Sequence, residues 1–378
     1  MTTRIPSIES FRVLAIVMVI LWHTDFVTNL IRSAGGRLPV VVTASLIWWA
    51  GVPYFLITAG YFFRQSVQNH GNHLDQYRRY VTPLTWMLTA WLCVYSFVPR
   101  NWPGEVVHHG LWQPFYLEAL RNVLQLKTHT LQSFLEGQRP VAHLWFVPAL
   151  LFSLAILTLM EIYRLQKYVI PLIIGLYAFV LAEEAAGGYL FRSTVHLELW
   201  SIALLLTAIG WWLVGHQRPS AALACSVIVA GYTFALIEGE IMQTLLHSSR
   251  RTILDHNYLG GILIGLGIFL LALAKPRLGR TTPFPSLATL TLGIYLSHFF
   301  VIYTLDPVRS RLRGAFPVWG DGCFTLLIYG ISALLTLALM KVPIARYLVV
   351  RPAKKHQRIA PSSKDERPAV TKLGANPD

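Results

Sequence analysis

The stretch IESFRVLAIVMVILWHTDF, residues 8–26, decides the fold class and raises the first question about function. It is apolar enough and long enough to cross a membrane, yet Glu9 and Arg12 stand near its start. His23 and Asp25 stand near its end. Eleven helical residues complete about three turns, so Arg12 and His23 share one face to within roughly 20°. Their separation along the axis is about 16 Å, roughly half of a ~30 Å hydrocarbon core.

The face that carries Arg12 and His23 has a third polar member. Glu9 lies three residues before Arg12 and falls on the same face, so a polar stripe runs from a charged end to a titratable group near mid-membrane. Asp25 lies about 200° round from His23 and is a separate candidate for substrate binding. An ionisable residue at mid-helix costs about 2.5–3.5 kcal/mol on insertion, which makes each one a functional candidate. A carbonyl-bonded core histidine is an equal alternative for a lone His, but the shared stripe favours function for His23.

The composition sets the class of protein. The chain has 378 residues, of which 54% are hydrophobic and 13% charged, and its mean hydropathy is +0.50. A soluble domain would carry about 25% charged residues. Together with repeated apolar runs of about 20 residues, this predicts an all-α, polytopic integral membrane protein. The net charge of +14 fits Lys and Arg on cytoplasmic segments, so we expect membrane lipids and no nucleic acid as partners.

Hydropathy predicts about ten transmembrane helices around a central polar cavity. The predicted spans are residues 11–31, 40–63, 80–98, 142–163, 168–182, 196–214, 220–238, 258–274, 286–305 and 323–341. An even number places both termini on one side, and short basic intervals indicate that this side is the cytoplasm. We divide the chain into a transmembrane domain, 1–345, and a basic tail, 346–378, whose polar composition predicts disorder.

A second polar pair lies in SLATLTLGIYLSHFF, residues 286–300. Tyr295 and His298 are three residues apart and therefore share a helix face. If the span enters from the cytoplasm near residue 286, His298 lies about 18 Å deep, at a level comparable to that of His23. Two histidines at one depth, on helices that run the same way, have the placement needed to meet in one cavity.

Arginines flank the second and third spans. Arg64 ends the second span, and Arg78 and Arg79 open the third. Together with Arg12 they would suit a polyphosphorylated ligand, because guanidinium groups bind phosphate through two parallel hydrogen bonds. Arginines at the inner ends of spans are also ordinary topology signals, and by themselves they favour that explanation.

The fourth span opens with RPVAHLWFVPALL, residues 139–151, where His143 and Trp145 enter from the outer side. An aromatic belt at the membrane interface explains Trp145, and a platform for stacking a glycan is the alternative. The three cysteines lie within apolar runs at no metal-ligand spacing, so we expect no metal.

These four stretches, in this order, resemble the membrane-bound O-acyltransferases of acyltransferase family 3, which acylate bacterial cell-surface sugars and related acceptors. Glu9, Arg12 and His23 match the family's arginine and histidine separated by ten residues, with an acidic residue three before the arginine. FLITAGYFF, residues 55–63, is similar to a Phe-rich element, with Ala59 where serine is usual. HLWFVPALL and LGIYLSH are similar to two later elements. The resemblance covers about residues 5–341.

The resemblance implies transfer of an acyl group, most often acetyl, from cytoplasmic acyl-CoA to a hydroxyl of a periplasm-facing cell-surface glycan. It implies the bacterial inner membrane as location, and a glycan acceptor that is free or lipid-linked. The acyl donor, acetyl-CoA, would be held by its phosphates at Arg12, Arg64, Arg78 and Arg79. His23 would be the base or an acyl carrier, Glu9 would orient Arg12, and Tyr295 or His298 would stabilise the oxyanion or complete a relay. The acceptor would contact His143, Trp145, Asp25 and the loop 99–141 with Trp102, Trp112 and Tyr116.

One departure and two alternatives remain open. The family often has a second arginine three residues before Arg79, where this chain has Gln76, so Arg78 is a substitute candidate for donor binding. A transporter or flippase for a lipid-linked sugar would use the same polar cavity without covalent chemistry. A structural or sensory membrane protein would leave the stripe of Arg12 and His23 unexplained.

Overall fold

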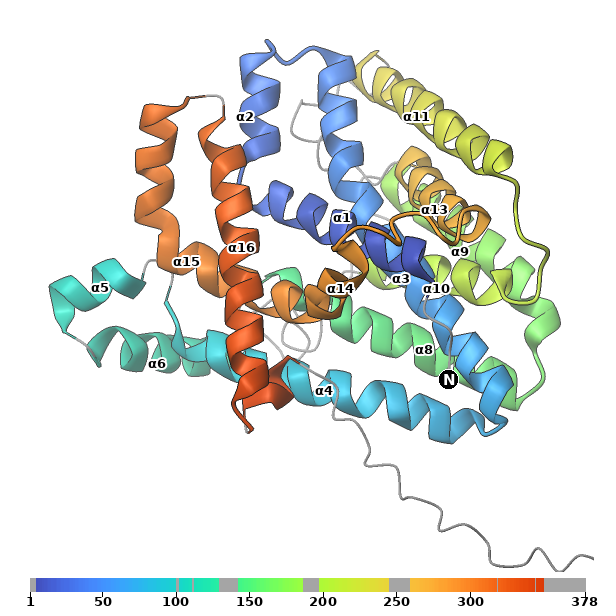
Figure 1. Cartoon of the computed structure of the whole chain (residues 1–378), viewed down its shortest axis with the longest axis horizontal. Helices are drawn as coiled ribbons and strands as arrows, with labels where there is room; N and C mark the ends of the chain where they lie inside the picture. The colour runs from blue at the N-terminus through green and yellow to red at the C-terminus, as the bar shows by residue number, and fades with distance from the viewer. Residues whose placement is uncertain are drawn as a thin grey trace, which may run out of the picture.

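The protein is an assembly of α-helices, as a computed structural model of the chain shows (Figure 1). The structure describes residues 5–99, 102–110, 112–128, 142–185, 197–244, 259–317, 319–343 and 345–349, and no strand occurs among them. The first half contains α1 (Pro6–His23), α2 (Phe26–Ser33), α3 (Leu38–His70), α4 (His73–Phe97), α5 (Trp102–His109), α6 (Gln113–Thr128), η1 (Ala142–Trp145) and α8 (Phe146–Ile162). The second half contains η2 (Gln166–Tyr168), α9 (Val169–Ala185), α10 (Leu197–Leu213), α11 (Ala221–Thr244), α13 (Leu259–Ala274), α14 (Phe284–Leu287), η3 (Ala288–Leu290), α15 (Thr291–Ala315), α16 (Gly320–Lys341) and η4 (Ala345–Leu348).

Seven helical stretches within the described residues are long and apolar enough to cross a membrane. They are Pro6–His23, Leu38–Asn69, His73–His109, His143–Ile162, Ala221–Thr244, Phe284–Ala315 and Gly320–Lys341. The other three predicted spans fall on α9, α10 and α13, which are apolar but only 17, 17 and 16 residues long. The predicted all-α, multi-pass architecture is confirmed. The central cavity and the cytoplasmic side of the termini stay predictions.

The prediction of one continuous first span over residues 11–31 is wrong. Pro6 begins α1, where its fixed φ suits the first helical turn, and the helix ends at His23. The Thr24 hydroxyl donates to the carbonyls of Ile20 and Leu21, and Asp25 adopts a left-handed conformation with φ of 55°. The chain then restarts as α2. His23 is therefore the last residue of a helix and not part of its middle.

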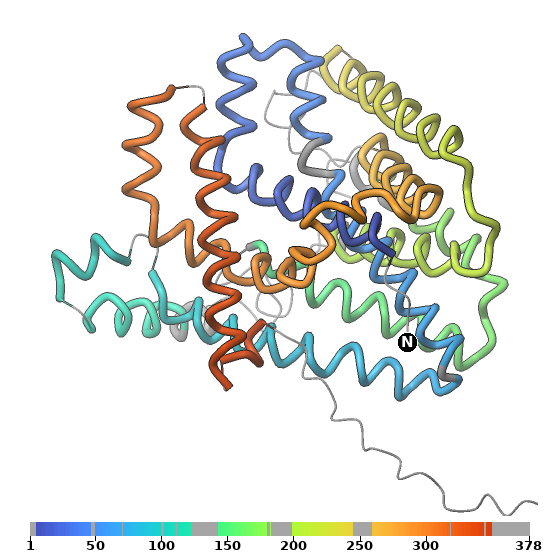
Figure 2. The backbone as a smooth tube through the Cα atoms, viewed as in Figure 1, coloured from blue at the N-terminus to red at the C-terminus, as the bar shows by residue number. Residues whose placement is uncertain are grey.

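Helix α1 lies at the centre of the assembly, and its neighbours come from both halves of the chain. It contacts α3, α13, α15 and α16 (Figure 2). The Tyr54 hydroxyl on α3 donates to the Ile8 carbonyl at 2.8 Å, and the Ser7 hydroxyl donates to the Ala272 carbonyl of α13 at 2.6 Å. These bonds fix the start of α1 against both helices.

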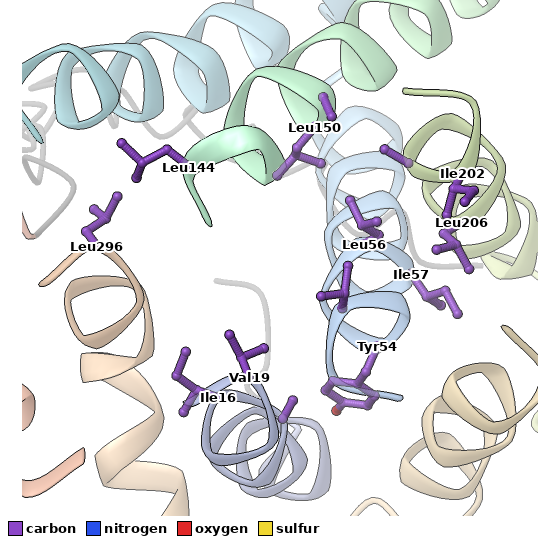
Figure 3. Packing of buried hydrophobic residues seen from close by; sticks show 14 of the residues in the cluster. Ile16, Val19, Tyr54, Leu56, Ile57, Leu144, Leu150, Ile202, Leu206 and Leu296 are labelled. Atoms are coloured by element: carbon purple, nitrogen blue, oxygen red, sulfur yellow. The ribbon is translucent and has the colours of Figure 1, made fainter. Parts of the chain in front are cut away.

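The apolar core surrounds this central helix. Ile16 and Val19 of α1 are buried, as are Leu144 of η1 and Leu296 of α15 (Figure 3). Across α3, the buried Ile57 lies toward α10 (Figure 3). In a water-soluble fold, burial of each such side chain contributes about 1.5–3 kcal/mol of stability. Between membrane helices, van der Waals packing of the helix surfaces contributes more than the hydrophobic effect.

Helices α3 and α10 touch backbone to backbone because glycine stands on each side. A methyl group on Gly60 would collide with the Thr207 carbonyl, and one on Gly210 would collide with the Ile57 carbonyl. Small residues at such crossings let membrane helices approach closely. Gly60 belongs to the Phe-rich element, so its role there is packing.

The interval 99–141, predicted as one large loop, contains the helices α5 and α6. Trp102 of α5 faces the bundle, since its ring nitrogen donates to the Thr304 hydroxyl of α15 at 3.1 Å. Trp112 and Tyr116 are instead 78% and 67% exposed. Residues 129–141 lie outside the described residues.

The ordered region continues beyond the predicted domain boundary at residue 345. Helix η4 packs on α4, where the Trp91 ring nitrogen donates to the Leu348 carbonyl at 2.9 Å, and Val349 is 2% exposed. The predicted disorder concerns residues 346–378, of which 346–349 belong to the described structure and 350–378 lie outside the described part of the chain.

The contact of α3 with α10 yields a test of packing. Gly60→Ala is expected to lower the stability of the protein in detergent by about 1–3 kcal/mol, because the added methyl group forces two backbones apart. Thermal unfolding of the purified protein measures the change. Gly330→Ala on α16 is the matched control, since a methyl group there meets nothing within 4 Å. Equal unfolding temperatures for the two variants would contradict the proposed contact.

Candidate active site

His23 ends α1 directly beside His298 of α15. The centroids of the two rings lie 5.5 Å apart, and the edge of Phe299 approaches His23 at 4.7 Å. His298 is fully buried, whereas His23 is partly exposed. Two polar motifs that are far apart in the sequence thus meet at one point, with His23 as the more accessible ring.

A third imidazole, that of His143 in η1, completes the cluster. Its ring centroid lies 4.7 Å from that of His298, and the ring stacks on Phe299 at 4.4 Å with an interplanar angle of 7°. The sequence predicted His143 at the outer edge of its span, but only 3% of it is exposed. We call His23, His143 and His298 the histidine cluster. In the described residues, no His, Cys, Asp or Glu group is arranged to hold a metal ion.

Hydrogen bonding defines the tautomer of His298. Its Nδ1 lies 2.6 Å from the Tyr295 carbonyl oxygen, one turn earlier in α15. A carbonyl can only accept, so Nδ1 carries the proton and the neutral ring keeps its lone pair on Nε2. This Nε2 is buried and has no hydrogen-bond partner among the described residues. This buried nitrogen, beside two other imidazoles, is therefore an open hydrogen-bond acceptor.

Two tyrosines fix the backbone around the cluster. The Tyr295 hydroxyl donates to the His143 carbonyl and so joins α15 to η1. The Tyr295 hydroxyl thus connects two elements in the structure, and the role in an oxyanion site or a relay that the resemblance implies for Tyr295 or His298 stays a prediction. Tyr95 of α4 donates to the Leu296 carbonyl at 2.7 Å and packs its ring against His143 at 5.5 Å. The sequence analysis missed Tyr95, because a tyrosine within an apolar span gives no signal beyond packing.

The start of the polar stripe has the expected form. Arg12 pairs with Glu9 at 3.1 Å, and its side chain is 30% exposed. Because α1 is one unbroken helix from Pro6 to His23, the separation of about 16 Å between Arg12 and His23 along the axis holds.

The arginines around the second and third spans divide into two kinds. The Arg64 guanidinium lies 3.6 Å above the Trp211 ring, donates to the Trp211 carbonyl at 3.3 Å and faces Glu161 at 3.9 Å. Arg78 and Arg79 are exposed on the first turns of α4. Arg64 is therefore largely buried against Trp211 and Glu161, whereas Arg78 and Arg79 are exposed.

The departure at Gln76 has a structural reason. Gln76 is 3% exposed, and its side-chain oxygen accepts from the Ser66 hydroxyl at 2.9 Å. This bond joins α3 to α4 at a buried position, where an arginine would bury a charge. The neighbouring Arg78 and Arg79 are the ones that reach the surface.

The remaining predicted substrate residues, Trp145 and Asp25, contact side chains outside the histidine cluster. Trp145 is partly exposed and packs against Phe146 with centroids 6.4 Å apart. The Asp25 carboxylate pairs with Arg309 and Arg313 of α15. Sequence reasoning missed both arginines, because they lie beyond residue 305, where the predicted span ended.

Comparison with known protein families gives one match that covers most of the chain. The model of acyltransferase family 3, described as an acyltransferase domain, matches residues 5–341. The chain belongs to acyltransferase family 3. This makes the protein a membrane acyltransferase. No curated protein and no solved structure matches the chain significantly.

The bond from Tyr295 to His143 provides a test of its positioning role. Tyr295→Phe is expected to lower stability by about 1–3 kcal/mol, because a buried carbonyl loses its donor. Thermal unfolding in detergent measures this. The matched control is Tyr329→Phe, since the buried Tyr329 hydroxyl has no hydrogen-bond partner among the described residues. A Tyr295 variant as stable as the Tyr329 variant would contradict the assigned role.

Proposed function

We propose that this acyltransferase moves an acetyl group from cytoplasmic acetyl-CoA to a hydroxyl of a periplasm-facing cell-surface glycan. The observation that carries the proposal is the histidine cluster, in which His298 lies beside two other imidazoles and its Nε2 has no hydrogen-bond partner among the described residues. A hydroxyl nucleophile needs such a base, because it is weak until its proton is removed.

His23 is the base in this proposal, because it is the most accessible of the three rings. A nitrogen of His23 takes the proton of the acceptor hydroxyl while the oxygen attacks the thioester carbonyl. The new C–O bond forms, the C–S bond breaks, and the imidazolium returns the proton to the CoA sulfur. His298 supports this step, since the lone pair of its neutral ring, beside His23, stabilises the transient positive charge.

The donor would be held at the other end of α1. Arg78 and Arg79 are exposed and Arg12 is partly exposed, so all three are able to meet phosphate oxygens. Glu9 orients Arg12 through the ion pair at 3.1 Å. Arg64 contributes less, because its guanidinium already has Trp211 and Glu161 as partners. The thioester would then reach the histidine cluster along the polar face of α1.

Removal of an imidazole or of Arg12 tests the reaction. His23→Ala, His298→Ala and Arg12→Ala are each expected to reduce O-acetylation, by about 10²–10⁴-fold in rate where the base is lost. Acetate released by mild base from surface polysaccharide, at matched protein level, provides the measurement. The control is His216→Ala, an exposed histidine after α10.

Unchanged acetate in all three variants would refute the proposal. The alternative of a flippase for a lipid-linked sugar has a separate signature. It predicts that membrane vesicles with the wild-type protein consume no acetyl-CoA in the presence of the acceptor glycan, whereas acetyl transfer requires equal consumption of donor and acylation of acceptor.

Removal of the exposed positive charges on α4 tests the proposed binding of the donor. Arg78→Ala and Arg79→Ala are each expected to raise KM for acetyl-CoA about tenfold at similar kcat, because a charge-assisted bond to phosphate is worth about 1.5–3 kcal/mol. Initial rates in membrane vesicles measure both constants. Arg277→Ala, an exposed arginine after α13, is the control. A fall in kcat at constant KM would assign these arginines a role other than donor binding.

A further inference from the structure

The break that ends α1 directly after His23 requires support from the rest of the protein. Asp25 and Arg164 are the two non-glycine residues with positive φ among those described, at 55° and 56°. A left-handed conformation at such a residue persists where the surroundings hold it in place. The position of His23 therefore depends on what fixes Thr24 and Asp25.

Arg309 of α15 supplies this support from 285 residues away in the sequence. Its guanidinium donates to the Thr24 carbonyl at 2.9 Å and pairs with the Asp25 carboxylate. Its Nε also donates to Asp321 of α16 at 3.2 Å. One side chain thus ties the end of α1 to two other helices.

The partners of Arg309 are themselves fixed. Asp321 is 1% exposed and accepts from Arg313 and from the Asn29 amide as well. Separation of Asp321 from its arginines would leave a buried carboxylate without compensation of its charge. The ion pair between Arg309 and Asp321 is therefore expected to stay formed. The Thr24 hydroxyl adds a further bond to α16, at 2.6 Å from the Thr325 hydroxyl.

We propose that Arg309 is a positioning residue, which sets the His23 ring against His298 by holding the Thr24 carbonyl. The carbonyl follows His23 by one residue, so its displacement moves the ring directly. The catalytic consequence rests on the proposed function of His23 as the base. The arginines proposed to bind the donor lie near the start of α1 and on α4, away from Arg309 in the sequence. Loss of Arg309 is therefore expected to lower kcat and to leave KM for acetyl-CoA unchanged.

Arg313 provides a matched control for this role. It pairs with the same two carboxylates, Asp25 at 3.6 Å and Asp321 at 3.1 Å, but it makes no bond to the Thr24 carbonyl in the described structure. Arg309→Ala is expected to reduce kcat on the order of 10²-fold, because a misplacement of about 1 Å costs this much. Arg313→Ala is expected to change kcat by less than about fivefold, because Asp321 keeps Arg309 as its charged partner and the Thr24 carbonyl keeps its donor. Equal losses of kcat would overturn the proposal.

A second measurement is independent of acyl transfer. Diethyl pyrocarbonate modifies accessible imidazoles, and peptide mass spectrometry of the full-length protein in detergent gives the rate at His23. The rate is expected to rise in Arg309→Ala and to stay at the wild-type value in Arg313→Ala. An unchanged rate in Arg309→Ala would refute the positioning role.

The two measurements separate this proposal from the function of His23. If His23→Ala retains acetylation, the proposed function fails, but the modification rate still reports whether Arg309 holds the ring. Arg309→Lys keeps a positive charge beside Asp321, so it replaces Arg309→Ala in this test if the alanine variant does not fold and accumulate in the membrane. It is expected to raise the modification rate less than alanine would, and a rate equal to that of wild type would also count against the proposal.

Discussion

Polar groups within a membrane protein must find partners inside the protein, and this constraint organises the whole structure. Arg12 has Glu9, Arg64 has Glu161 and Trp211, and Asp321 has two arginines and an amide. Against this background, buried imidazole nitrogens without a partner in the described residues stand out. Among them are nitrogens of His143 and His298, which lie beside the accessible His23. Under the proposed function, a substrate supplies the missing partner at this place.

The sequence predicted what depends on local periodicity. The polar stripe of Glu9, Arg12 and His23 follows from helix geometry alone, and the shared face of Tyr295 and His298 does too. Long apolar runs predicted the helices for the same reason. The break at Thr24 could not be found in this way. It depends on Arg309, whose side chain arrives from a helix 285 positions later.

The site differs from its prediction for a similar reason. His143 is predicted to open the fourth span as a substrate contact, and in the structure the Tyr295 hydroxyl bonds its carbonyl while its side chain is buried beside His298. Gln76 was seen as a departure from a binding motif, whereas its bond with Ser66 makes it part of the contact between two helices. A motif lists residue types, and only packing distinguishes those that hold helices together, such as Gly60, from those that meet the substrate.

A division of charge along α1 explains why the proposed chemistry suits a membrane. Permanent charges lie where phosphate would bind, at the start of the helix, and the end of the helix carries a group that can be neutral. A neutral imidazole is less costly to bury than a carboxylate or an ammonium group, which allows a base to be kept ready at this depth. In the proposed mechanism, charge develops on His23 only during proton transfer. His298, whose tautomer is fixed by the Tyr295 carbonyl, would stabilise this charge as a preorganised neighbour.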